Sequence, residues 1–281
     1  MCVSSFEIPP EPSSGLKLIL GISFLLTVVI GFLGNVVSIA ILAKVLRSRQ
    51  TVPNALIFIL ACVDLLTIIL GFGPALLNYL SGLSIAHAPL CNFQGATLNF
   101  LYLMSITLVT CLSFDRYLAL FTPFFYKANS VFNCKKLSFT LLLFCCFAMI
   151  ISLLPSFGAG RRVLQYPGTF CTIELNPKDL GGKITLNTNL AFLLFCTMII
   201  VLCNAAVSWK SFQMLNRSRE RQPSVDNEEM GSILSVCTTD ECQFLKLSMI
   251  VMTLFLLCWT LFMVSYPQAS RANIAVLCRL R

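Results

Sequence analysis

The chain alternates between long apolar runs and shorter polar segments. Six of the runs are long enough for a helix to cross a bilayer, because each has at least about 18 residues. They cover roughly Leu18–Leu42, Ala55–Leu80, Phe93–Leu120, Leu137–Leu154, Leu190–Val207 and Leu245–Val264. The alternation of apolar and polar residues that a membrane-spanning barrel strand requires is absent. The pattern therefore predicts an all-α membrane protein with six transmembrane helices.

The composition supports this class and suggests an orientation. Of the 281 residues, 57% are hydrophobic and only 11% are charged, so a soluble domain is excluded. Glu7, Glu11 and a single basic residue, Lys17, precede the first run, whereas three basic residues follow it: Lys44, Arg47 and Arg49. Cytoplasmic loops carry the excess of Lys and Arg, so we expect the N-terminus outside the cell. The net charge of +8 then reflects topology and attraction to anionic membrane lipids, and no nucleic-acid partner is expected.

The third run carries a marker at each end. Cys91 lies at its start, and Asp115, Arg116 and Tyr117 lie at its end. Arg116 follows Cys91 by 25 positions (116 − 91), which as a helix would rise about 38 Å, close to the thickness of a bilayer with its headgroups, about 40–45 Å. A cysteine at one membrane face and a charged group at the other suggest a signal receptor.

The cysteines differ in their expected compartments. Of the fourteen, four are predicted to lie outside the cell: Cys2, Cys91, Cys171 and Cys278. Cys91 at the top of the third span and Cys171 in the long loop before the fifth form the natural disulfide pair. His87 is the only histidine, and no cluster of histidines and cysteines suggests a metal. No nucleophile and base are paired as in an enzyme, and no cofactor is expected.

Two polar residues lie inside the first and second runs. Asn35 and Asp64 occur at similar depths from the cytoplasmic ends of their spans. A carboxylate this deep is costly without polar partners or water, and Asn35 is one plausible partner. The pair is interpreted either as a hydrogen-bonded packing contact or as a hydrated cation site, with sodium as the candidate ion at Asp64.

The charged triad has a candidate partner near the sixth run. Glu241 precedes Trp259 by 18 residues (259 − 241) and is expected on the same membrane side as Arg116. A bond between Arg116 and Glu241 would hold two helix ends together, and its release would open a cleft for a partner. The alternative is an ordinary interfacial charge that water screens.

Together these residues resemble the span-by-span signatures of rhodopsin-like (class A) G-protein-coupled receptors. The matching positions are Asn35, Leu60-Ala61-x-x-Asp64, Cys91, Asp115-Arg116-Tyr117 and Cys258-Trp259. The loop from Gln165 to Cys171, which reads QYPGTFC, resembles the second extracellular loop of prostanoid receptors, with Phe170 in place of the usual tryptophan. The resemblance implies a rhodopsin-like helical bundle in the plasma membrane, a prostanoid-like lipid ligand and a heterotrimeric G protein.

The subgroup resemblance also implies how the ligand is held. Three groups would bind its carboxylate, and two have matching positions here: the hydroxyls of Thr169 and Tyr79. The third, an arginine on the seventh span, has no counterpart. Each match also has a simpler interpretation, because Tyr79 suits an interfacial aromatic belt and Thr169 could be a turn hydroxyl.

The end of the sequence departs most from this family. We assign residues 1–266 to the bundle and residues 267–281 to a short atypical tail without a seventh span. We therefore expect weak or absent signalling, pairing with full-length receptors, and retention in the endoplasmic reticulum as an alternative to the plasma membrane. The alternative function, a six-span transporter or channel, would predict a re-entrant pore segment or inverted repeats, and neither is visible.

Overall fold

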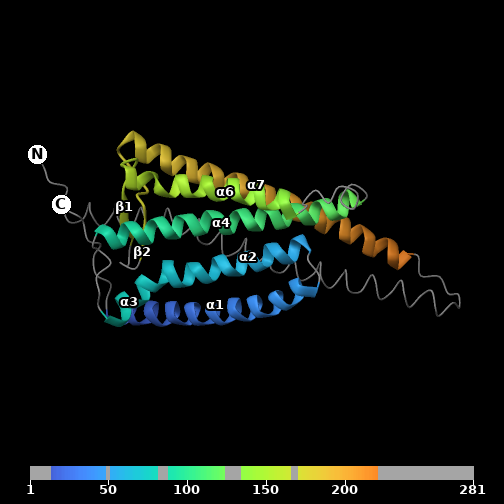
Figure 1. Ribbon diagram of the computed structural model, residues 1–281, viewed down its shortest axis with the longest axis horizontal. Coiled ribbons are helices and arrows are strands. Elements are labelled where there is room, and N and C mark those ends of the chain that lie inside the picture. The colour runs from blue at the N-terminus through green and yellow to red at the C-terminus, as the bar shows by residue number, and fades with distance from the viewer. Residues whose placement is uncertain (1–13, 49–50, 82–87, 124–133, 166–169, 221–281) are drawn as a thin grey trace, which may run out of the picture.

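Long helices lie side by side, with a small β-hairpin at one end of the bundle (Figure 1). The computed structural model describes residues 14–48, 51–81, 88–123, 134–165 and 170–220. The elements are α1 (Ser14–Ser48), α2 (Val52–Leu66), the π-helical turn η1 (Thr67–Phe72), α3 (Gly73–Ser81), α4 (Ala88–Phe121), α6 (Cys134–Leu153), the 3₁₀ turn η2 (Leu154–Phe157), β1 (Arg162–Gln165), β2 (Phe170–Ile173) and α7 (Leu180–Glu220).

Five helical segments of the described part are long and apolar enough to cross a membrane. They are Gly21–Ser48, Val52–Asn78, Pro89–Phe121, Ser138–Phe157 and Leu180–Met214. These segments match the first five predicted runs, and the helical membrane class is confirmed. The sixth predicted run lies outside the described residues, and the external position of the N-terminus stays a prediction.

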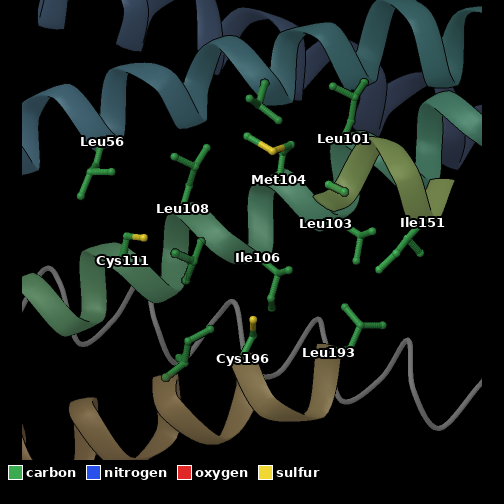
Figure 2. Close-up of a cluster of buried hydrophobic side chains, with 14 residues drawn as sticks. Leu56, Leu101, Leu103, Met104, Ile106, Leu108, Cys111, Ile151, Leu193 and Cys196 are labelled. Carbon is green, nitrogen blue, oxygen red and sulfur yellow. The ribbon is translucent and has the colours of Figure 1, made fainter. Parts of the chain in front are cut away.

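The core of the bundle forms around α4. This helix contacts α2, α6, α7 and both strands. Figure 2 shows the main buried cluster, in which Leu103, Ile106 and Leu108 of α4 are almost completely shielded from solvent. Leu56 of α2 and Ile200 of α7 belong to the same cluster. Outward-facing apolar residues such as Ile30, which is 69% exposed on α1, are what a helix surrounded by lipid requires.

The second span is interrupted by the π-helical turn η1. Pro74 lies at the second position of α3, directly after this turn. Proline has no N–H to donate to the carbonyl of Leu70, four residues earlier, and its ring crowds that carbonyl. A single π-helical turn is a common response to such an interruption. The hydropathy pattern predicted one uninterrupted helix here, because Gly-Pro does not lower the apolar content of the run.

The outer loop folds into an antiparallel hairpin. Strand β1 pairs with β2 so that Arg162 faces Ile173 and Leu164 faces Cys171. The chain leaves η2 through Gly158 and Gly160, whose φ angles are +91° and +103°. A side chain would be strained at both angles, so these glycines allow the chain to turn back over the bundle.

Candidate functional site

The hairpin is attached covalently to the outer end of α4. Cys91 and Cys171 form a disulfide with a Cα–Cα distance of 5.3 Å, and the two residues are 80 positions apart in the sequence. Both are buried. The predicted pairing is present in the structure, and it holds β2 over the helices.

A second attachment lies one turn along α4, at Gln94. Its side chain is completely buried. The Nε2 group of Gln94 donates a hydrogen bond to the carbonyl of Gly71 in η1 at 3.1 Å. Its Oε1 atom accepts a hydrogen bond from the backbone N–H of Cys171, also at 3.1 Å. One side chain therefore connects the second span, the third span and strand β2.

Arg162 attaches the other strand. Its Nη1 group donates to the hydroxyl of Ser156 at 2.8 Å and to Oδ1 of Asn92 at 3.4 Å, and Nη2 donates to the carbonyl of Ser152. Arg162 is only 6% exposed, and this burial lowers the pKa of its guanidinium below the ordinary value. The three acceptors belong to α4, α6 and η2, so Arg162 fixes β1 to this side of the bundle.

Three phenylalanine rings meet beneath the hairpin. Phe24 of α1, Phe72 of η1 and Phe170 of β2 contact one another edge to face, with ring centroids 5.5–5.7 Å apart. The phenylalanine that stands where prostanoid receptors usually have tryptophan is thus part of an aromatic cluster. The cluster gives the outer end of the first and second spans an apolar surface.

Two residues, Tyr79 and Thr169, are predicted to bind the ligand. Tyr79 belongs to α3, although the placement of its side chain is not described. Thr169 lies outside the described residues and directly precedes Phe170. Their role in ligand binding stays a prediction.

The middle of the bundle holds the predicted polar residues. The hydroxyl of Ser105 on α4 donates a hydrogen bond to Oδ1 of Asp64 at 3.2 Å. Asn35 instead donates to the carbonyl of Gly31 in its own helix at 2.9 Å. Sequence reasoning missed Ser105, although a serine inside the long apolar third run was the available signal.

At the inner end, α4 and α7 are joined by polar and aromatic contacts. Asn204 of α7 donates a hydrogen bond from its amide to the hydroxyl of Ser113 at 3.2 Å. The rings of Tyr117 and Phe121 stack with centroids 4.7 Å apart, and the ammonium of Lys210 lies 5.4 Å from the Phe121 centroid. The third and fifth spans therefore end together on this side.

The charged triad lies at this junction. Asp115 is completely buried, whereas Arg116 and Tyr117 are partly exposed. Glu241 and Trp259, the other two residues of the predicted switch, lie outside the described residues. The proposed bond between Arg116 and Glu241 therefore stays a prediction.

A shallow groove of about 450 Å³ lies on the outer face of α6 and α7. Phe147, Phe192 and Phe195 line it together with Asn187, Thr188 and Ala191. None of the predicted site residues lines this groove. The groove is therefore separate from the disulfide-linked hairpin and from the charged triad. Within the described residues, no group of three or more His, Cys, Asp or Glu side chains could hold a metal ion.

The comparison with known families agrees with this arrangement. The family described as the 7 transmembrane receptor (rhodopsin family) matches residues 34–273. The chain belongs to this family. Squid rhodopsin has the same fold: its crystal structure aligns with a TM-score of 0.67 at 20% sequence identity, over 92% of this chain and 70% of that chain.

Curated proteins similar to this chain include receptors for prostaglandin E2 and thromboxane A2. The prostaglandin E2 receptor EP4 subtype of Rattus norvegicus is 29% identical over 229 residues, which are 80% of this chain and 45% of the relative. The same receptor of Homo sapiens is 29% identical over 72% of this chain and 41% of the relative. The thromboxane A2 receptor of Homo sapiens is 26% identical over 74% of this chain and 65% of the relative.

These relatives confirm the predicted resemblance to class A receptors of the prostanoid type. The chain spans less than half the length of the EP4 receptors that it matches. Its family is a class of membrane receptors and not a class of enzymes. The alternative of a six-span transporter or channel finds no support.

Proposed function

We propose that this protein is a plasma-membrane receptor for a lipid mediator of the prostaglandin class. The observation that carries the proposal is the attached hairpin, whose Phe170 meets Phe24 and Phe72 over the outer ends of the spans, in a chain whose relatives are prostanoid receptors. A lipid ligand needs an apolar surface for its chains and a few polar groups that orient it. The aromatic cluster supplies the first requirement.

The carboxylate of the ligand would be held by hydroxyl groups at the edge of this cluster. Thr169 directly precedes Phe170, and Tyr79 lies seven residues (79 − 72) after Phe72. Each hydroxyl can donate one hydrogen bond to a carboxylate oxygen. Thr169 and Tyr79 are thus close in sequence to Phe170 and Phe72, whose rings would contact the hydrocarbon part of the ligand.

The inner end would pass the signal to a heterotrimeric G protein. Arg116 lies where α4 and α7 are joined by Asn204 and Ser113. In the proposed mechanism, Arg116 bonds to Glu241 in the resting state, and movement near Trp259 breaks this bond and exposes a cleft. Such a two-state contact is what a ligand needs in order to shift the balance between conformations.

Asp64 and Ser105 would hold a sodium ion in the resting state. Their oxygen atoms lie 3.2 Å apart, and carboxylate and hydroxyl oxygens suit a hard cation. A bound cation would offset the negative charge of Asp64 inside the apolar bundle. Because Asp64 and Ser105 lie between the two ends of the bundle, loss of the cation on activation would couple ligand binding at the outer end to the conformational change at the inner end.

Binding to membranes that contain the full chain tests the proposal. Tritiated prostaglandin E2 and a stable thromboxane A2 analogue serve as probes, with vector-only membranes as the control. We expect saturable binding of at least one probe, and a loss of affinity of at least tenfold in Thr169→Val and Tyr79→Phe. Absence of binding by wild-type protein that reaches the cell surface would contradict the proposal.

Signalling and localisation have separate measurements. Prostaglandin-evoked cAMP or calcium tests the expectation of weak or absent signalling. Surface labelling of an epitope-tagged chain distinguishes the plasma membrane from retention in the endoplasmic reticulum. Co-precipitation with a full-length prostanoid receptor tests the predicted pairing. Signalling strength, localisation and pairing all stay predictions.

A further inference from the structure

The π-helical turn of the second span determines how the span continues outward. A π-helical turn contains one residue more than an α-helical turn would. Because each residue of an α-helix advances the chain by about 100°, removal of the extra residue would rotate everything that follows by about that angle. The segment that follows is α3, which carries Tyr79.

The turn is pressed closely against α4 at Gly71. A Cβ atom at this position would lie 2.4 Å from Cδ2 of Leu98 and 3.1 Å from its Cγ. Gly71 is buried, and the missing side chain is what lets the backbone of η1 approach α4. The same approach brings the carbonyl of Gly71 within reach of Gln94.

Gln94 is suited to hold this turn. Its amide donates to the Gly71 carbonyl, and its oxygen accepts from the N–H of Cys171. Both bonds are made by a side chain that is completely buried, where an unsatisfied donor or acceptor is costly. Because Cys171 is itself bonded to Cys91, the other end of the Gln94 contact cannot move freely.

We infer that Gln94 is a positioning residue that locks the π-helical turn to the extracellular strand β2 and so sets the rotation of α3. The described side chains of α3 report this rotation. Ala75 is completely buried, whereas Leu77 is 55% exposed. A rotation of about 100° would change the exposure of both residues.

The inference deepens the proposed function, on which its consequence for the ligand rests. If Tyr79 binds a carboxylate, its position depends on the rotation of α3 and therefore on Gln94. The extracellular hairpin and the second span would then act as one unit in shaping the ligand site. Neither Gln94 nor Gly71 needs to contact the ligand for this effect.

Two matched pairs of variants test the inference in the full chain. Gly71→Ala should push η1 away from Leu98 and break the Gln94 bond. Gly34→Ala in α1 is its control, because a Cβ at Gly34 meets nothing within 4 Å. Gln94→Met removes the hydrogen bonds to Gly71 and Cys171 while keeping a side chain of similar size. Gln213→Met, at an exposed position of α7, is its control.

The main readout needs no ligand. Cysteines introduced as Ala75→Cys and Leu77→Cys are labelled with a small maleimide in nanodiscs, against the background of the same protein without the added cysteine. We expect Ala75→Cys to be protected in the wild-type background and labelled at least fivefold faster with Gln94→Met or Gly71→Ala. Hydrogen exchange of residues 67–81 is the second measurement, which applies even if Ala75→Cys folds poorly.

The ligand readout separates this inference from the proposed function. Tritiated prostaglandin E2 should bind Gln94→Met about tenfold more weakly at equal surface expression, and the double variant with Gly71→Ala should lose little more. If wild-type protein binds no prostanoid, the proposed function fails while labelling still decides the role of Gln94. Unchanged labelling and unchanged exchange of residues 67–81 in both variants would overturn the inference.

Discussion

The hydroxyl of Ser105 on α4 donates a hydrogen bond to the carboxylate of Asp64 on α2 across 3.2 Å. The two residues are 41 positions apart in the sequence and lie in the middle of two membrane spans. A carboxylate in this environment needs polar neighbours or water. This contact is the observation on which the proposal of a sodium site at Asp64 rests.

The first prediction concerns sodium. Removal of the hydroxyl in Ser105→Ala takes away one oxygen that would bind the cation, so prostaglandin E2 affinity should lose most of its dependence on sodium. Competition binding in sodium chloride and in choline chloride measures this effect. Ser38→Ala is the control, because the Ser38 hydroxyl bonds within its own helix. An equal sodium effect in Ser105→Ala and Ser38→Ala would argue against a cation at Asp64.

The second prediction concerns the close packing of the β-hairpin against α4. A Cβ at Gly95 would lie 2.6 Å from Cδ of Arg162 and 3.0 Å from the carbonyl oxygen of Cys171. Gly95→Ala should lift the hairpin and cost about 1–3 kcal/mol, as overpacking usually does. Gly34→Ala, where nothing lies within 4 Å, should be neutral. Thermal unfolding in detergent measures both variants. Equal melting temperatures for Gly95→Ala and Gly34→Ala would contradict close packing of the hairpin at Gly95.

The third prediction separates two adjacent arginines. Arg162 is buried with three hydrogen bonds, whereas Arg161 is exposed. Arg162→Met should destabilise the protein by about 1–3 kcal/mol because it leaves buried acceptors such as the Ser152 carbonyl unsatisfied. Arg161→Met removes the same charge and should have little effect. A similar loss in both variants would mean that charge, and not the buried contacts, is what matters.

The fourth prediction concerns the disulfide. Cys91→Ser, Cys171→Ser and the double variant should each lose about 2–5 kcal/mol of stability. The three losses should be nearly equal, because the bond is lost once in every case. Thermal unfolding and prostaglandin E2 binding measure the outcome. A double variant that is much less stable than either single variant would indicate that the two cysteines contribute independently.

Much of the fold could be predicted from the sequence because hydropathy is a local property. Each of the first five apolar runs is helical, because lipid tolerates only backbone that is hydrogen-bonded within the protein. The fifth helix is longer than predicted: the run was placed at Leu190–Val207, and the observed span covers Leu180–Met214. Cys91 and Cys171 could be paired because few cysteines are expected outside the cell. Asp64 could be singled out because a carboxylate is rare within a span.

The partners of polar residues could not be predicted in this way. Asn35 was a plausible neighbour of Asp64, but the structure pairs Asp64 with Ser105 and leaves Asn35 bonded to its own helix. Two residues at equal depth on neighbouring helices face each other only if both helices are rotated suitably about their axes. Hydropathy alone does not determine these rotations. Gln94, near the start of α4, and Arg162, in the loop hairpin, were missed because a single polar residue outside a recognised motif gives no signal of its contacts.

The sequence by itself determined that the chain forms apolar helices, that Cys91 and Cys171 pair and that a charged triad lies at the other end of the third span from Cys91. These features depend on the free energy of transferring side chains from water to lipid and on the spacing of residues along a single helix, and both can be read from the sequence. The tertiary structure alone decided that Gln94 joins the π-helical turn to β2 and that Arg162 fixes β1. Such contacts depend on how helices rotate and approach each other, as at Gly71 and Gly95, and that is settled only when the whole bundle packs.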